Sequence, residues 1–176
     1  MIGVIKMNYE LRENLAAVYK LCDYIEASPY GQNIAKSYNM KIRHIVDADL
    51  IAFLTYLSAS DGKVDVAETK VVNEYFPHFK LDTNAIVEMI KRFNIHSAEF
   101  ERIVPRPVKI FVEIDKFGVT EKDRNKPVAS STMYAVYFDL AKELIQCDRD
   151  VDSNELRDAD TYMKMIKNYI YSKLDV

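Results

Sequence analysis

Apolar residues recur at every third or fourth position along most of the chain, which is the spacing of one face of an α-helix. Residues 8–26 give the clearest case, with an apolar face of Leu11, Leu15, Val18, Cys22 and Ile25. The pattern continues over residues 33–59, 66–76, 81–93, 128–147 and 156–174. In residues 97–118, Pro105 and Pro107 force a break or a new helix whose first turn contains proline. No stretch has the pattern of a strand. We therefore predict an all-α fold, a single compact bundle of about seven or eight helices.

Turn and cap residues indicate where these helices end. Residues 28–31, Ser-Pro-Tyr-Gly, are expected to break the chain after the first helix. The stretch 33–59 is expected to form two helices that bend near residues 44–47. Its later part is apolar nearly all round, which is typical of a central core helix. Asp82 is expected to cap the helix that it precedes, and Gly118 to end the helix that it follows.

Composition and charge restrict the classes of function. The 176 residues include only four Gly and five Pro, which suits one helical domain spanning residues 1–176. The formal net charge is −3 and no run of Lys and Arg is present, so nucleic acid is not an expected partner. No stretch reaches the roughly 20 apolar residues of a membrane span. The first residues lack the apolar core of a signal peptide. A cytoplasmic protein is therefore expected, with Cys22 and Cys147 as buried free thiols.

Two acidic loops share one residue frame, Asp-x-x-Val-Asp-x-x-Glu. The first copy is residues 61–68, DGKVDVAE, and the second is residues 148–155, DRDVDSNE. The residues around the two copies also agree, since Leu57 matches Leu144 before the loop and Tyr75 matches Tyr162 after it. We interpret this as an internal duplication of a helix–acidic loop–helix unit, covering about 44–80 and 131–172.

Helix capping explains part of the frame. Asp65 and Asp152 are suitable N-cap residues, and Glu68 and Glu155 follow them at the three-residue spacing of a capping box. Gly62 can adopt the left-handed conformation that ends the preceding helix. A purely structural role therefore stays open for these five positions.

Capping does not explain Asp61, Asp148 and Asp150, which are expected at helix C-termini, where the helix dipole disfavours negative charge. If the loops meet across the pseudo-repeat, their carboxylates cannot all stay ionised without a cation or raised pKa values. A hard divalent cation would neutralise them, Ca²⁺ first and Mg²⁺ or Mn²⁺ next. The candidate metal ligands are Asp61, Asp65, Glu68, Asp148, Asp150, Asp152 and Glu155. Neither copy has the entering Asp pair of an EF-hand, so a self-contained EF-hand is rejected.

The segment FLTYLSASDGKVDVAETKVVNEYF, residues 53–76, resembles the TerB tellurite-resistance superfamily. The mark of that family is an apolar helix that ends in a small-residue–Asp-Gly-x-Val turn, followed by an acidic residue and a Glu that open the next helix. The second acidic loop also fits the two-lobed layout of the family, whereas residues 97–131 match nothing in it. The resemblance implies an all-α fold, acidic metal-associated clusters and a role in bacterial stress response.

Catalysis is not expected. His44, His78 and His96 have no zinc-binding spacing, and the chain has no Gly-rich phosphate loop and no nucleophile elbow. A carboxylate-based hydrolase is the remaining enzyme alternative. Two hypotheses stand. The first is a metal-responsive module whose acidic loops bind a divalent cation, with no organic cofactor. The second is an interaction module that docks another protein, in which the acidic loops only cap helices.

Overall fold

The computed structural model is built from helices, as the spacing of apolar residues predicts. It describes residues 8–60, 62–95, 99–118, 124–147 and 153–174, and these contain no strand. The α-helices are α1 (Tyr9–Glu26), α2 (Pro29–Tyr38), α3 (Ile42–Ser58), α4 (Val66–Tyr75), α5 (Thr83–Phe93), α6 (Arg106–Phe117), α7 (Val128–Cys147) and α8 (Ser153–Leu174). One 3₁₀ helix, η1 (Phe100–Arg102), precedes α6. The predicted all-α bundle is confirmed.

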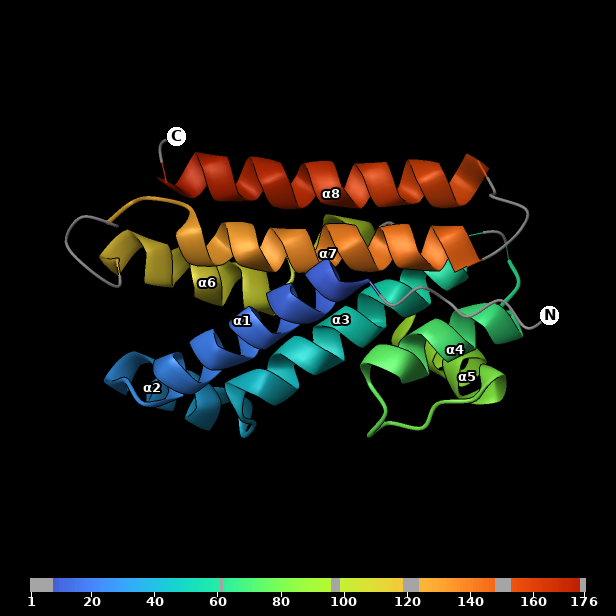
Figure 1. The fold of residues 1–176 in the computed structure, drawn as a ribbon, viewed down its shortest axis with the longest axis horizontal. Coiled ribbons are helices and arrows are strands. Elements are labelled where there is room, and N and C mark those ends of the chain that lie inside the picture. Colours follow the sequence, from blue (N-terminus) through green and yellow to red (C-terminus); the bar gives the residue numbers. More distant parts are fainter. Residues whose placement is uncertain (1–7, 61, 96–98, 119–123, 148–152, 175–176) are drawn as a thin grey trace.

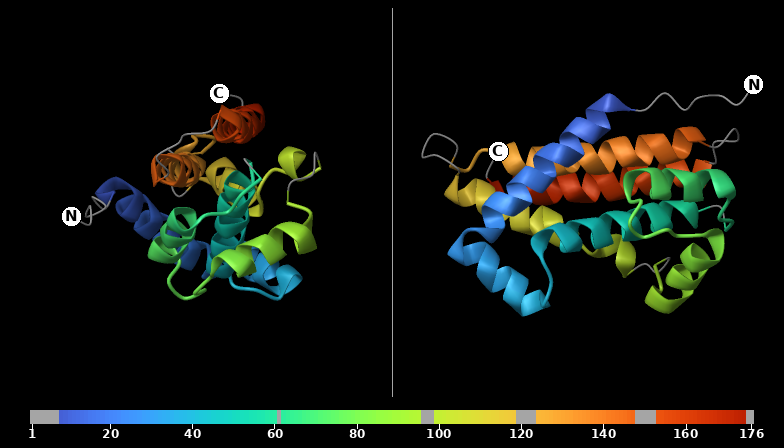
Figure 2. Two further views of the ribbon diagram at one scale, coloured as in Figure 1. Left: turned by 90° about the vertical axis from the view of Figure 1, so that its right-hand side faces the viewer. Right: turned by 60° about the horizontal axis from the view of Figure 1, so that its bottom comes forward.

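Helix α7 holds the bundle together, since it packs against α1, α3, α4, α6 and α8. Figure 1 shows α7 and α8 side by side, with α1 and α3 crossing them obliquely and α4 and α5 at one end of the bundle. Figure 2 shows the same arrangement from two further sides. This layout leaves the ends of the long helices at the two ends of the molecule.

An aromatic cluster fills the core between α3, α7 and α8. The ring of Phe53 lies 5.1 Å from that of Tyr137 and 4.8 Å from that of Tyr162, between centroids. The ring of Tyr56 lies 5.6 Å from that of Tyr162. Helix α3 supplies two of these rings from its later part, which is apolar nearly all round. Eleven residues of α3 are buried. Its predicted place at the centre of the core is confirmed.

One expected chain break is confirmed and one is wrong. The first helix ends at Glu26, just before residues 28–31. These residues also start α2, because the Ser28 side chain caps Gly31 N and Pro29 fits the first helical turn. No bend occurs near residues 44–47, which lie inside the continuous helix α3. The break falls earlier, at Asn39, whose left-handed backbone (φ 48°) ends α2. Asparagine tolerates this conformation because its short polar side chain bonds locally.

Other predicted ends agree with the structure. The Asp82 side chain accepts a hydrogen bond from Ala85 N at the start of α5, and Gly118 ends α6 with φ 72°. Of the two free cysteines, Cys22 is buried, but Cys147 is only half-buried, so the prediction of two buried thiols holds for the first alone. Within the described residues, no helix combines the length and the apolar character that crossing a membrane requires.

Candidate acidic site

The helix ends that flank the two acidic loops lie at the same end of the bundle. The C-terminal ends of α3 and α7 and the N-terminal ends of α4 and α8 lie together at the right of Figure 1, and Figure 2 shows the same from a second direction. Helices α4 and α8 also begin at equivalent positions of the repeated frame, Val66 and Ser153. The described parts of the two copies therefore meet the acidic loops at one end of the bundle.

The first copy forms a complete capping box. Asp65 Oδ1 accepts a hydrogen bond from Glu68 N at 2.9 Å, and Glu68 Oε2 accepts one from Asp65 N at 2.8 Å. Before the cap, Gly62 has φ 80° and no neighbour within 4 Å of an added Cβ. The expected capping roles of Asp65 and Glu68 are confirmed, whereas Gly62 has the expected left-handed backbone but does not end α3, whose C-cap is Ala59. Capping accounts for one oxygen of the Glu68 carboxylate and leaves the other to be explained.

Glu68 is far more buried than a capping box requires, with 4% of its surface exposed. Its second oxygen, Oε1, is buried and accepts no hydrogen bond from the described residues. Burial raises the pKa of Glu68 to about 7, although the backbone hydrogen bond from Asp65 acts in the opposite direction. The buried Ser58 hydroxyl also lowers the pKa of this carboxyl, although their contact falls short of hydrogen-bond geometry. The interior thus holds a carboxyl group whose charge is only partly compensated.

Glu155, the corresponding glutamate of the second copy, lies in the first turn of α8 and is also buried. It is 5% exposed, and its charge contributes to the raised pKa of Glu68. The two glutamates that close the repeated frame are therefore both buried and near enough for their charges to interact. Two buried carboxylates at close range cannot both stay ionised unless a proton or a cation compensates them.

Four of the seven predicted metal ligands lie outside the described residues, namely Asp61, Asp148, Asp150 and Asp152. In the described part of the chain, no group of three or more Asp, Glu, His or Cys side chains could hold a metal ion. The structure thus brings together Glu68 and Glu155, with Asp65 engaged in the cap beside them. The seven-ligand metal site stays a prediction.

Ser58 is the residue that the sequence analysis missed. It lies at the end of α3, is fully buried, and its Oγ has no hydrogen-bond partner among the described residues. The sequence carries a weak signal for it, because Ser58 is a polar residue in a helix that is otherwise apolar nearly all round.

Comparisons with known proteins add no relative: no family, no curated protein and no solved structure matches the chain. The resemblance to the TerB superfamily accordingly stays a prediction that depends on residues 53–76 and on the second acidic loop.

Proposed function

We propose that this protein is a non-enzymatic, TerB-like stress-response module that binds a divalent cation where its two acidic loops meet. Ca²⁺ is the first candidate ion, followed by Mg²⁺ and Mn²⁺. The observation that supports the proposal is the buried Glu68 carboxylate, whose Oε1 lacks a hydrogen bond within the described residues while Glu155 lies nearby.

The chemistry of this arrangement favours a hard cation. Glu68 and Glu155 present carboxylate oxygens, and the Ser58 hydroxyl adds a neutral oxygen at the same buried place. Oxygen donors of this kind suit Ca²⁺, Mg²⁺ and Mn²⁺, and the missing ligands would come from the aspartates of the two loops. Without a cation, the protonated form of Glu68 is favoured chiefly by burial, and the charge of Glu155 adds to the rise of its pKa. Binding of the ion would fasten the α3–α4 unit to the α7–α8 unit.

The test is thermal unfolding in chelator and then with millimolar Ca²⁺, Mg²⁺ or Mn²⁺. An ion that binds only the native state raises the melting temperature. Glu68→Gln is the variant of choice, because glutamine keeps the capping box and removes only the charge. We expect the wild type to gain stability with at least one ion and Glu68→Gln to lose that gain. Glu88→Gln, on the exposed face of α5, is the control and should respond as the wild type does.

The absence of any upshift in the wild type with all three ions would reject the metal-binding module. An equal upshift in the wild type and in Glu68→Gln would place the ion elsewhere and reject this site.

A second candidate, a protein-docking module, is favoured by an apolar groove of about 490 Å³ between α7 and α8. Phe138 and Leu156 line it with 51% of each residue exposed, and Lys142, Lys164 and Lys167 lie along it. An acidic amphipathic helix would fit such a groove, because its apolar face would cover the aromatic floor and its carboxylates would meet the lysines. In this function the acidic loops only cap helices.

The groove is tested with a fluorescent acidic amphipathic peptide and the variants Phe138→Asp and Tyr9→Asp. Tyr9 is 73% exposed and lies outside the groove, so Tyr9→Asp controls for a general loss of apolar surface. Binding that Phe138→Asp alone abolishes supports the docking module. If neither the wild type nor Tyr9→Asp binds the peptide, an acidic amphipathic helix is rejected as the ligand of this groove.

A further inference from the structure

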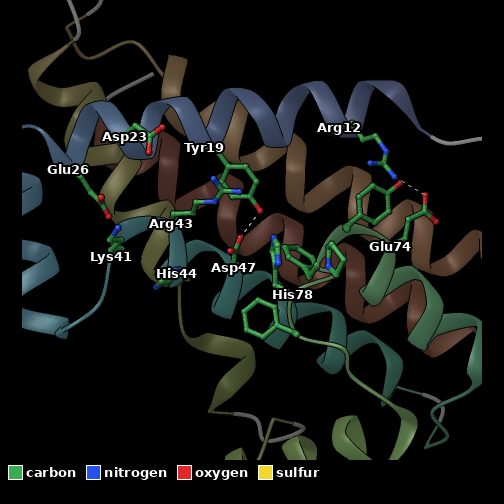
Figure 3. A pocket seen from close by; sticks show the side chains of 14 residues that line it. Arg12, Tyr19, Asp23, Glu26, Lys41, Arg43, His44, Asp47, Glu74 and His78 are labelled. Atoms are coloured by element: carbon green, nitrogen blue, oxygen red, sulfur yellow. Dashed lines mark hydrogen bonds and ion pairs between the residues drawn. The ribbon is translucent and has the colours of Figure 1, made fainter.

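A polar trough of about 670 Å³ lies between α1, the N-terminal half of α3 and the segment that follows α4. None of the acidic-loop residues lines it, so it is separate from the candidate cation site. Figure 3 shows Tyr19 from α1 and Arg43 and Asp47 from α3 at its centre, with His78 facing them from the segment after α4. The trough therefore draws its side chains from three parts of the chain that are distant in sequence.

Arg43 is held in a defined position in this trough. Its guanidinium carbon lies 3.9 Å from the centroid of the Tyr19 ring, a stacked cation–π arrangement. The Tyr19 ring is fixed in turn, because its hydroxyl donates a 2.6 Å hydrogen bond to Asp47 Oδ1. Burial raises the pKa of Tyr19 well above its ordinary value, so the hydroxyl stays a donor. A guanidinium stacked on a fixed ring loses little freedom when it binds a ligand.

The acidic side chains of the trough are mostly engaged within the protein. Asp47 accepts the hydrogen bond from Tyr19. Glu26 accepts a 2.5 Å hydrogen bond from Ile42 N at the start of α3. Glu74 pairs with Arg12 at 3.2 Å. Asp23 is the one acidic residue of the lining whose side chain makes no hydrogen bond or ion pair with a described residue.

Most basic side chains of the trough, by contrast, are not engaged within the protein. The lining includes Lys41, Arg43, His44 and His78, and none of these four side chains makes a hydrogen bond or ion pair with a described residue. Helix α3 also begins here; its N-cap residue, Lys41, makes no side-chain cap bond, and the Glu26 carboxylate occupies the positive end of the helix dipole instead. The N–H donors that remain available therefore belong to basic side chains, which suit a ligand with a negatively charged group.

We propose that this trough binds a small organic anion, with a carboxylate or phosphate group held by Arg43 and assisted by Lys41, His44 and His78. A planar guanidinium recognises both groups through paired N–H···O bonds. Asp23 and Asp47 face the same space, which favours a ligand of low negative charge over a polyanion. Phe79, 44% exposed at the edge of the trough, can cover the apolar body of the ligand.

Isothermal titration at low ionic strength tests the proposal, with succinate as the carboxylate probe and glycerol 3-phosphate as the phosphate probe. Chelator is present throughout, so the outcome does not depend on the proposed cation site. We expect saturable binding of at least one probe and a loss of at least tenfold in affinity in Arg43→Gln. The probe that binds more tightly identifies the class of anion.

Arg92→Gln is the matched control, because Arg92 also lies over an aromatic ring, that of Phe93 at 5.6 Å, and is outside the trough. It should bind the probes as the wild type does. Tyr19→Phe keeps the ring and removes the hydrogen bond to Asp47, so it should weaken binding less than Arg43→Gln. No saturable binding of either probe by the wild type, or equal losses in Arg43→Gln and Arg92→Gln, would overturn the proposal.

Discussion

Ser130 donates two hydrogen bonds to one oxygen of Asp115: its backbone N–H lies 2.8 Å from Oδ2 and its hydroxyl 2.5 Å. The other carboxylate oxygen, Oδ1, accepts a 2.8 Å bond from Ala129 N. Asp115 belongs to α6 and is 3% exposed. The first turn of α7 is therefore capped from the preceding helix, by a buried charge at the positive end of the α7 dipole.

Asp115→Ala should lower the free energy of unfolding by about 3 kcal/mol, because it leaves buried donors of α7 without their charged acceptor. Urea denaturation gives the number. Asp160→Ala is the comparison, since Asp160 is exposed and pairs with Lys164 only on the surface of α8. Exposed pairs of this type contribute roughly 0.5 kcal/mol or less. Similar losses in the two variants would contradict the capping role of Asp115.

Local sequence patterns predicted local structure well in this chain. The helical class follows from apolar spacing, and the Asp65–Glu68 box follows from two residue types three positions apart. The cap at Asp115 could not be found in this way, because it joins residues 15 positions apart through the packing of two helices. The break at Asn39 was missed for a different reason: asparagine ends a helix less often than glycine, so its signal is weaker.

The candidate sites depend still more on tertiary packing. The frame predicted Glu68 and Glu155 as related residues, but only the packing of the helices buries both and lets their charges interact. The trough has no sequence motif at all. Tyr19 and Asp47 are 28 positions apart, and His78 comes from a third segment.

Asp65→Ala should destabilise the protein by about 1 kcal/mol in chelator through the loss of the N-cap of α4. The hydrogen bond from Glu68 N to Asp65 Oδ1 is then lost. Asp65→Asn or Asp65→Ser should recover most of the loss, because both side chains cap helices. An unchanged midpoint of chemical denaturation in Asp65→Ala would remove the capping account of this residue.

Gly31→Ala should destabilise the protein even though alanine is the better helix former by about 1 kcal/mol. An added Cβ at this position in α2 would lie 1.9 Å from the carbonyl oxygen of Ile25, which is backbone and cannot swing away. We expect a loss of about 2 kcal/mol or more from such overpacking. Gly62→Ala is the comparison, since the space around Gly62 is open and only its φ of 80° opposes a side chain. It should cost about 1 kcal/mol. A stabilised Gly31→Ala variant would show that α2 does not pack against the end of α1 this closely.

The pH dependence of stability should report the buried carboxyl of Glu68. Its pKa is about 7 in the folded protein, raised from 4.5 chiefly by burial. A raised pKa means that the folded state binds the proton more tightly than the unfolded state does. The stabilisation linked to this proton is therefore complete below pH 4.5 and is lost as the pH rises through 7.

In chelator, the wild type should lose up to about 3 kcal/mol relative to Glu68→Gln over this range. Glutamine stays neutral and keeps the capping bond, so the variant should be the more stable protein above pH 7. Urea denaturation of both proteins at half-unit steps from pH 4.5 to 8 measures the difference directly. If the difference in free energy of unfolding between the two proteins were constant across the range, Glu68 would have the same pKa in the folded and unfolded states. Burial would then not raise its pKa. Loss of the pH-dependent difference on addition of Ca²⁺ would connect this carboxyl to the cation, because a bound ion replaces the proton as the compensating charge.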